Sequence, residues 1–293
     1  MPGITRHQPS RDGLRGPRRQ PMFPMMAQAK ARTATLPRTA GRASPAKPRT
    51  GGDSESRRSR PIRPDQLTER ILYRDGLMLV IDKPAGIVVH PGPGGGPHLE
   101  HWFPLLRFGL PRPPALAHRL DRDTSGCLVL GRHPKALRRL GRLFAEGKVE
   151  KIYWAVVAGI PDPPQGRIEI GLRKETRGTG WKVIVDPEGQ RAVTDYRVLG
   201  THDGRAWLEL RPRTGRTHQV RVHCATLSSP IVGDIAYGGP GEVPLHLHAR
   251  AIALPLYPAK PPVAVTAPVP QHMLAALRRL GYDPAAETGE PLP

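Results

Sequence analysis

The chain has few cysteines, few acidic side chains and no long apolar run. Its 293 residues contain two cysteines, Cys127 and Cys224, and no C-x-x-C pair. We therefore expect neither a disulfide framework nor a cysteine-rich zinc site, and a reducing compartment fits best. No apolar stretch reaches the roughly 18 residues that a membrane helix needs, so we expect no membrane-spanning segment.

Acidic residues are scarcest in the first 64 residues, which hold 15 Lys and Arg but only 3 Asp and Glu. The whole chain has a formal net charge of +20. Such an excess favours a phosphate-bearing partner, because each phosphate that is neutralised releases counterions. Two other interpretations of the basic start stay open: an arm that only keeps the chain soluble, and an organellar transit peptide. We expect a cytoplasmic protein.

The domain organisation follows from where aliphatic periodicity begins. Residues 1–61 are rich in Pro, Arg, Gly, Ser and Thr and show almost no aliphatic periodicity. They cannot bury enough apolar surface to offset chain entropy, so we expect a disordered basic arm. Periodic apolar patterns start at Ile71. We therefore expect one folded domain at 62–285, a short disordered tail at 286–293 and a monomeric protein.

Predicted strands outnumber predicted helices and do not alternate with them regularly. This order favours an α+β fold over a doubly wound α/β fold. The alternation of apolar residues predicts strands at 71–73, 78–81, 128–131, 149–157, 167–170, 182–185, 192–199, 206–211 and 245–254. Helical spacing and end signals predict helices at 134–146, 217–226 and 272–280.

The most distinctive motif is the stretch HRLDRDTSG at residues 118–126. It places Asp121 inside a turn crowded with cations, immediately before the apolar run at 127–130. A turn of this composition can hold one ionised carboxylate at the end of a buried strand, beside a polyanion held by arginines. We therefore regard Asp121 as the leading candidate for a reactive residue.

Three further segments accompany this motif: DKPAGIVVHP at 82–91, KIYWAVVAG at 151–159 and TGRTHQVRVH at 214–223, which PIVGD follows at 230–234. In this order the four segments closely resemble the RluA-type RNA pseudouridine synthases, over nearly all of residues 71–255. The resemblance implies the pseudouridine synthase fold, a mixed, largely antiparallel sheet flanked by helices with an RNA-binding cleft. It also implies an isomerase that acts on uridines in tRNA or ribosomal RNA without a cofactor or a metal.

The resemblance assigns roles to individual residues. It implies that Asp121 is the nucleophile, that Arg221 pairs with it, and that Tyr153 stacks on the target base. One carboxylate suits a reaction that breaks and remakes the bond at the ribose C1′, and a guanidinium offsets the cost of burying it. The residues expected to bind substrate are Arg119, Lys151, Arg216, His218 and Gln219.

Several alternatives stay open. In one alternative, Tyr153 is a core strand residue and Arg221 is a phosphate clamp or a surface residue. Trp154, on the opposite strand face, is the better candidate for the core or the surface. A catalytically inactive RNA-binding relative is a second class of function. A metal hydrolase is a third, because four histidines invite a metal site: His218 and His223 on one predicted helix, and His246 and His248 on one predicted strand face.

Overall fold

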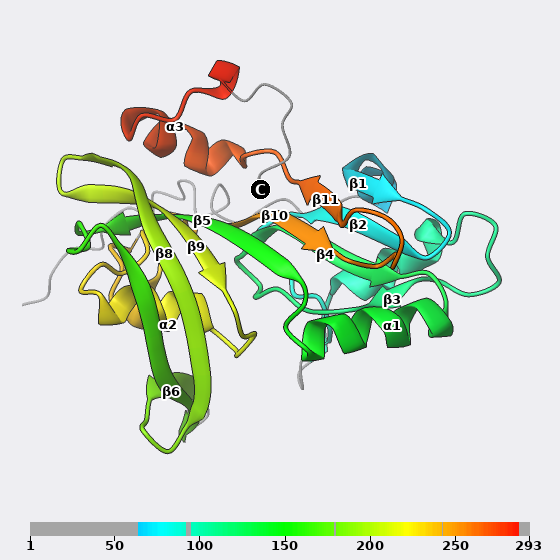
Figure 1. The fold of residues 1–293 in the computed structure, drawn as a ribbon, viewed down its shortest axis with the longest axis horizontal. Coiled ribbons are helices and arrows are strands. Elements are labelled where there is room, and N and C mark those ends of the chain that lie inside the picture. Colours follow the sequence, from blue (N-terminus) through cyan, green and yellow to red (C-terminus); the bar gives the residue numbers. More distant parts are fainter. Residues whose placement is uncertain (1–63, 92–94, 179, 242, 287–293) are drawn as a thin grey trace, which may run out of the picture. The chain divides into compact units, whose positions relative to one another are not determined.

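The computed structural model describes residues 64–91, 95–178, 180–241 and 243–286. In this part of the chain eleven strands form one sheet (Figure 1). The main path runs β1-β2-β4-β10-β5-β9-β8-β6-β7, while β3 pairs with β4 and β11 pairs with β10. The pairing of β4 with β10 is parallel and the other pairings between strands are antiparallel. The expected α+β fold with a mixed, largely antiparallel sheet is confirmed.

The elements have the following bounds. The strands are β1 (Ile71–Arg74), β2 (Met78–Lys83), β3 (Ala115–Leu116), β4 (Ser125–Gly131), β5 (Glu150–Ala158), β6 (Gln165–Arg177), β7 (Gly180–Val185), β8 (Gln190–His202), β9 (Arg205–Pro212), β10 (Leu247–Leu254) and β11 (Val263–Thr266). The α-helices are α1 (Pro134–Ala145), α2 (Gln219–Thr226) and α3 (Gln271–Arg279). The 3-10 helices are η2 (Pro64–Arg70), η3 (Leu99–Leu106), η4 (Ile235–Tyr237) and η5 (Pro284–Ala286).

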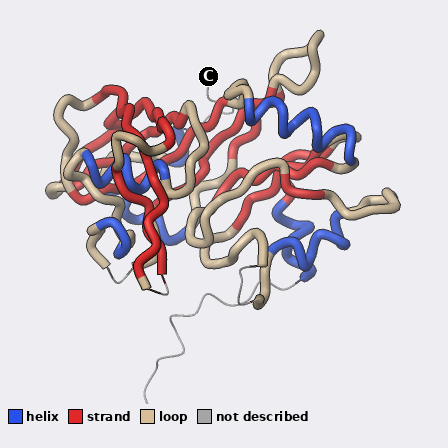
Figure 2. The backbone as a smooth tube through the Cα atoms, turned by 90° about the horizontal axis from the view of Figure 1, so that it is seen from below, coloured by secondary structure: helices blue, strands red, loops and turns tan. Residues whose placement is uncertain are grey.

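The first half of the sheet is covered on both faces. Met78 and Val80 of β2 enter a buried cluster with Leu140 of α1. Leu79 and Ile81 point the other way and pack with residues of η2 and η3. Figure 2 shows helices on both sides of these strands. Because both faces are buried, β2 and β4 are apolar at nearly every position instead of alternating with polar residues.

The turn between β1 and β2 is stabilised by Asp75. Its carboxylate accepts hydrogen bonds from the backbone N–H groups of Leu77 (2.7 Å) and Met78 (2.8 Å). Short acidic side chains often bond the backbone in this way within tight turns. The strands predicted at 71–73 and 78–81 thus pair as an antiparallel hairpin across this turn.

The second half of the sheet is also covered on both faces, and successive side chains of β5 point to opposite faces. Ala155 and Val157 face the cluster that contains residues of α2. Ile152, Trp154 and Val156 face the opposite cluster, which contains residues of α3. The prediction that Trp154 lies on the other strand face from Tyr153 is confirmed, and Trp154 belongs to the core.

Some predicted boundaries were wrong. Two strands extend to 13 residues each, β6 and β8, where shorter segments were predicted. The helix predicted from Thr217 begins at Gln219, and the strand predicted from Leu245 begins at Leu247. The short strands β3 and β11 were not predicted, because two to four residues are too few to show a period.

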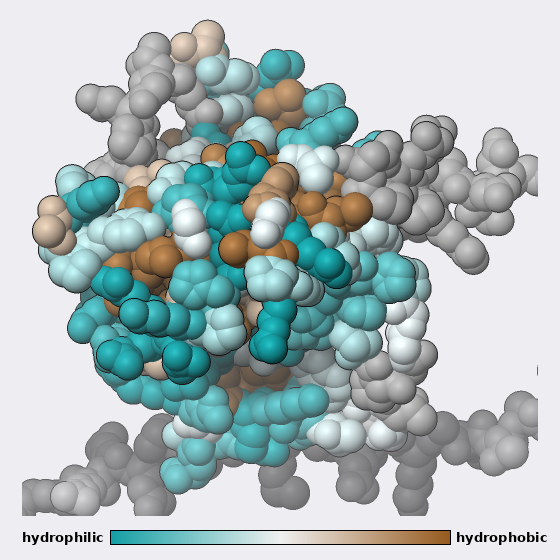
Figure 3. Space-filling view, turned by 90° about the vertical axis from the view of Figure 1, so that its right-hand side faces the viewer, coloured by the Kyte–Doolittle hydropathy of each residue, from teal (hydrophilic) through white to brown (hydrophobic). Residues whose placement is uncertain are grey.

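The described residues fall within one compact unit, Glu55–Pro293. The predicted arm at 1–61 and, apart from Ala286, the predicted tail at 286–293 lie outside the described residues. Among the described residues, no helix is both long and apolar enough to cross a bilayer. The face on the right of Figure 1 is mainly hydrophilic, with hydrophobic side chains in small patches (Figure 3).

Candidate active site

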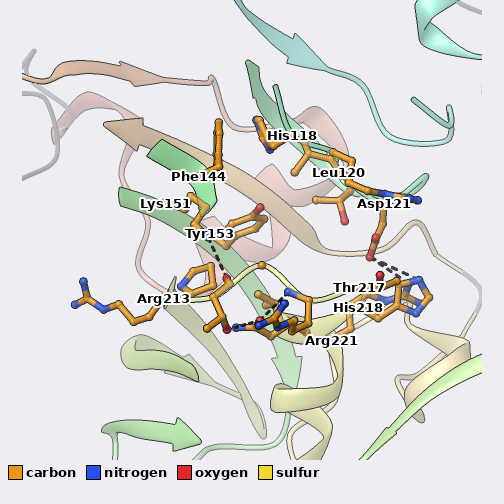
Figure 4. Close-up of a pocket in the computed structure, with 18 of the residues that line it drawn as sticks. His118, Leu120, Asp121, Phe144, Lys151, Tyr153, Arg213, Thr217, His218 and Arg221 are labelled. Atoms are coloured by element: carbon orange, nitrogen blue, oxygen red, sulfur yellow. Dashed lines mark hydrogen bonds and ion pairs between the residues drawn. The ribbon is translucent and has the colours of Figure 1, made fainter. Parts of the chain in front are cut away.

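A cavity of about 480 Å³ opens where three separate segments meet: the Asp121 turn, strand β5 and the loop between β9 and α2 (Figure 4). Each of these segments carries one of the motifs identified in the sequence. The polar residues lining the cavity include His118, Arg119, Asp121, Lys151, Tyr153, Arg213, Arg216, His218, Gln219 and Arg221. All eight residues proposed from the sequence as catalytic or substrate-binding therefore line one cavity.

The Asp121 turn is held by the strand that follows it. Its backbone closes through a 3.2 Å hydrogen bond from Thr124 N–H to the Asp121 carbonyl. The next strand, β4, pairs in parallel with β10 at Gly126 and Ala249. Gly126 has a φ of 107°, and a Cβ at this position would collide with the Ala249 carbonyl. Only glycine therefore allows β10 to approach so close to the turn.

The side chain of Lys83 also holds the Asp121 turn in place. This role was not predicted from the sequence. The Lys83 side chain is fully buried, and the ammonium donates hydrogen bonds of 2.8–2.9 Å to the carbonyls of Pro84, Arg122 and Thr124. Burial lowers the pKa of Lys83 to about 7, although Asp123, Asp121 and Asp82 act in the opposite direction. The signal was present in the sequence as a lysine inside the first motif, at 82–91.

Two cationic or titratable groups face the Asp121 carboxylate. Atom Nη1 of Arg221 lies 3.6 Å from Asp121 Oδ2, and Nε2 of His218 lies 3.8 Å from the same oxygen (Figure 4). The expected proximity of Arg221 to Asp121 is therefore present. The distances are those of ion pairs and exceed those of short hydrogen bonds.

The shortest contacts of Arg221 are made to another residue, Asp234. The guanidinium donates two 2.7 Å hydrogen bonds to it, from Nε and Nη2. The Asp234 side chain is completely buried, and the bidentate geometry fixes the plane of the guanidinium. This second carboxylate was not assigned a role from the sequence, although it ends the PIVGD segment at 230–234.

His218 lies just before α2, so it is not on the helix with His223 as predicted. It adopts a left-handed backbone conformation with φ 52°. Its Nδ1 is 2.8 Å from the hydroxyl of Tyr237, which itself accepts a 3.1 Å hydrogen bond from Val183 N–H. The two ring nitrogens of His218 thus have different neighbours: Nδ1 contacts the Tyr237 hydroxyl, and Nε2 faces Asp121.

Gln219 connects the loop before α2 to the sheet. Its side-chain oxygen accepts from Thr214 Oγ1 (2.7 Å) and Arg216 N–H (3.0 Å), and its amide nitrogen donates to Val193 O and Thr194 Oγ1 (both 2.9 Å). The side chain is buried. Its hydrogen-bonding groups are thus engaged within the protein, and they set the shape of the cavity wall.

Tyr153 and Lys151 reach the cavity from the same face of β5. Tyr153 packs against two hydrophobic clusters, and desolvation together with the charge of Asp121 raises the pKa of its hydroxyl. Lys151 donates a 3.0 Å hydrogen bond to the carbonyl of Thr214, and desolvation lowers its pKa to about 8. Figure 4 shows the Tyr153 ring between Lys151 and Asp121.

Arg119 and Arg216 lie at the exposed edge of the cavity. Arg216 donates a 3.3 Å hydrogen bond to the Arg191 carbonyl. Both arginines thus line the same cavity as Asp121 and remain exposed. This position suits contact with phosphate groups of a large polyanion.

The histidines proposed for a metal site lie apart. His246 precedes β10 and contacts the Pro244 carbonyl (2.8 Å), while His248 on β10 bonds Ser125 Oγ (2.8 Å). Within the described residues, no three His, Cys, Asp or Glu side chains are grouped as metal ligands. Both cysteines, Cys127 and Cys224, are buried and unpaired.

The cavity lining thus contains one carboxylate, that of Asp121, among several cationic side chains, an arrangement that suits a polyanionic ligand. A family model described as RNA pseudouridylate synthase matches residues 77–226. A Zymomonas mobilis protein named as an RNA pseudouridine synthase is 43% identical over 212 residues, which cover 70% of this chain and 95% of that protein. The chain therefore belongs to the RNA pseudouridylate synthase family, whose members are isomerases.

Two further comparisons agree. A Xanthomonas campestris protein named ribosomal large subunit pseudouridine synthase D is 37% identical, over 73% of this chain and 71% of its own length. The solved structure of human RNA pseudouridylate synthase domain containing 4 superposes with a TM-score of 0.64 at 30% identity, covering 74% of this chain and 95% of that one. The resemblance seen in the sequence motifs is thus confirmed at the level of family and fold.

Proposed function

We propose that this protein isomerises uridines within RNA to pseudouridine and that Asp121 is the nucleophile. The observation that carries the proposal is the position of the Asp121 carboxylate, which projects into the cavity within 3.6 Å of a guanidinium that a second, buried carboxylate holds in place. The guanidinium places a positive charge beside Asp121, and a carboxylate can act as the nucleophile in covalent catalysis.

The chemistry requires no redox partner. The bond between N1 and the ribose C1′ breaks, the base turns, and a bond between C5 and C1′ forms. C5 loses a proton and N1 gains one, so atoms and charge balance without a second substrate. One carboxylate suffices, because a glycoside hydrolase needs its second carboxylate to deliver water and here water must be excluded.

The target base must leave its stack to reach Asp121. Enzymes that act on bases extrude them into a pocket and receive them on aromatic faces. Tyr153 is the aromatic residue that lies beside Asp121 in the cavity. Because its pKa is raised, its hydroxyl stays protonated at neutral pH and can donate a hydrogen bond while the ring stacks on the uracil.

The remaining residues proposed from the sequence have three roles. Arg119 and Arg216, together with Lys151, offer cations for the RNA backbone around the target nucleotide. His218 orients toward Asp121 through its Nε2. Gln219 acts as a positioning residue, because its hydrogen bonds hold the loop that carries Arg216 and precedes Arg221.

The substrate is a tRNA or a ribosomal RNA. The relative named ribosomal large subunit pseudouridine synthase D makes large-subunit ribosomal RNA the first substrate to test. We also propose that the enzyme acts as a monomer. We place it in the cytoplasm, where these RNAs occur and where unpaired cysteines such as Cys127 and Cys224 are stable.

The test maps pseudouridines in large-subunit ribosomal RNA and tRNA treated with purified protein. We expect wild-type protein to form pseudouridine and Asp121→Asn to form none. The matched control is Asp123→Asn, because Asp123 is two residues away but exposed and paired loosely with Arg122 (3.8 Å). Parental activity of the Asp121→Asn variant would exclude the nucleophile. RNA binding by wild-type protein without any conversion would favour the inactive RNA-binding alternative.

A further inference from the structure

We infer that Trp181 is a stacking platform for the nucleobase next to the extruded uridine. This inference rests on the proposed function and adds a second aromatic subsite to it. Trp181 lies on β7, outside every motif that marked the active site in the sequence. Its indole is 45% exposed, whereas Trp154 and Trp207 are buried in the core.

The position of Trp181 connects it to the reactive carboxylate. Its ring lies 4.9 Å from the ring of His218, with a tilt of 33° between the planes. His218 in turn places Nε2 3.8 Å from Asp121. Only one side chain therefore separates the exposed indole from the residue that acts on the uridine.

Strand β7 is anchored firmly to the site. The backbone N–H of Val183 donates a 3.1 Å hydrogen bond to the hydroxyl of Tyr237, and the same hydroxyl contacts His218. Tyr237 also lies under Arg221, whose guanidinium carbon is 5.1 Å from the ring centroid. Trp181 thus belongs to a strand that is hydrogen-bonded to the support of the active-site cations, and its distance from Asp121 is set by that support.

One cation lies over the indole and another over the neighbouring Tyr237 ring. The ammonium of Lys174 lies over the Trp181 ring at 4.4 Å, and that of Lys182 lies over the Tyr237 ring at 4.9 Å. An exposed cation–π contact is worth about 0.5–1 kcal/mol, whereas a base stacked on an aromatic ring is worth about 1–3 kcal/mol. A nucleobase can therefore displace the Lys174 ammonium from the ring, and the ammonium is then available to the adjacent phosphate.

The occupant is a single-stranded nucleotide for a physical reason. Extruding the uridine removes one stacking partner from its neighbour, which then exposes a base face to water. An indole within reach of the cavity replaces that lost partner. Stacking is tolerant of base identity, because each base presents a π-face. Trp181 should therefore add affinity for RNA without requiring a particular neighbouring base.

The experiment measures conversion kinetics on a large-subunit ribosomal RNA transcript for wild type, Trp181→Ala, Trp181→Phe and Phe108→Ala. Phe108 is the matched control, because it is 38% exposed and lies under the guanidinium of Arg74 at 4.3 Å. Arg74 does not line the cavity, whereas His218, the ring partner of Trp181, does. We expect Trp181→Ala to raise KM roughly 5- to 150-fold, the equivalent of about 1–3 kcal/mol. We expect kcat to change less than about threefold, Trp181→Phe to recover most of the affinity, and Phe108→Ala to match wild type.

A fluorescence measurement keeps the inference testable if Trp181→Ala does not fold. RNA should quench the tryptophan emission of the wild type, and Trp181→Phe should lose this quenching while it still binds. Quenching that persists in Trp181→Phe, or a KM of Trp181→Ala equal to that of wild type, would overturn the inference and leave the role of Asp121 untouched. Absence of pseudouridine with the wild-type protein would instead refute the proposed function.

Discussion

Arg221 forms two 2.7 Å hydrogen bonds with Asp234, a residue whose side chain is completely buried. This bidentate pair uses Nε and Nη2 and leaves Nη1 directed at Asp121, 3.6 Å away. The guanidinium is therefore oriented by one carboxylate for use by another. Fixed charges of this kind require no reorganisation when the substrate arrives.

The ion pair between Arg221 and Asp234 predicts the effect of the variant Asp234→Asn. Removing one partner of a buried ion pair typically costs about 3–5 kcal/mol, so we expect a loss of this size in the free energy of unfolding. Turnover should fall as well, because the guanidinium loses its fixed orientation beside Asp121. Urea denaturation and single-turnover conversion of RNA measure the two effects separately.

The control for this variant is the exposed pair between Arg191 and Glu169, whose contact is 2.6 Å. Glu169→Gln should leave both stability and turnover at wild-type values, because solvent screens exposed pairs. Arg221→Leu should lower the free energy of unfolding about as much as Asp234→Asn does, and it should lower the turnover rate further. Normal turnover of Arg221→Leu would rule out the role of Arg221.

Lys83→Met should loosen the Asp121 turn. The variant leaves buried carbonyl oxygens of Pro84, Arg122 and Thr124 without their donor. Each unsatisfied buried group costs about 1–3 kcal/mol, so we expect stability to fall by at least this amount. We also expect kcat to fall more than KM rises, because the turn carries Asp121, the proposed nucleophile. Lys148→Met, at an exposed lysine paired with Glu146, serves as the control, and equal stability of the two variants would argue against the support by Lys83.

Tyr153 should act mainly through its ring. Tyr153→Phe retains the stacking face, whereas Tyr153→Ala removes it together with about 1–3 kcal/mol of stacking. We expect Tyr153→Ala to lose RNA affinity and turnover, and Tyr153→Phe to retain the affinity. Because the pKa of the hydroxyl is raised, the pH profile of the wild-type rate should show no limb from Tyr153 near neutral pH. Equal affinities of the Ala and Phe variants would count against stacking.

Two buried histidines predict loss of stability in acid. Burial lowers the pKa of His223 to about 4 and that of His248 to about 3, from the ordinary value of 6.5. At a pH between about 4 and 6.5, both histidines are protonated in the unfolded chain but neutral in the folded chain. The free energy of unfolding therefore falls as the pH drops from 6.5 toward 4. Two protons correspond to a slope of about 3 kcal/mol per pH unit near pH 5. Denaturation curves between pH 7.5 and 4.5 measure this slope.

His223→Leu isolates one of these groups. Among the described residues, neither ring nitrogen of His223 has a hydrogen-bond partner, so the replacement sacrifices no hydrogen bond there. The variant should reduce the acid slope of the wild type by the contribution of one proton, about 1.4 kcal/mol per pH unit. His202→Leu, at an exposed position, should leave the slope unchanged. An unchanged slope in His223→Leu would mean that this side chain is not the neutral buried group inferred from its surroundings.

Local patterns in the sequence predicted most of the elements. The alternation in β5 and the amphipathic spacing of α1 depend on residues within a few positions of one another, so they are visible without the fold. The motif around Asp121 was distinctive for the same reason, because its charges and its following apolar run are contiguous. The ends of β6 and β8 were not predictable, because pairing between the strands decides where they stop.

By itself the sequence determined the α+β class, the family resemblance and the identity of the candidate nucleophile. Tertiary structure alone decided which residues support it. Lys83 meets the Asp121 turn, Asp234 takes the short bonds of Arg221, and Trp181 reaches His218 from a neighbouring strand. The physical reason is that these contacts join residues far apart in the chain. Strand register and helix packing bring them together, and no local periodicity encodes either one.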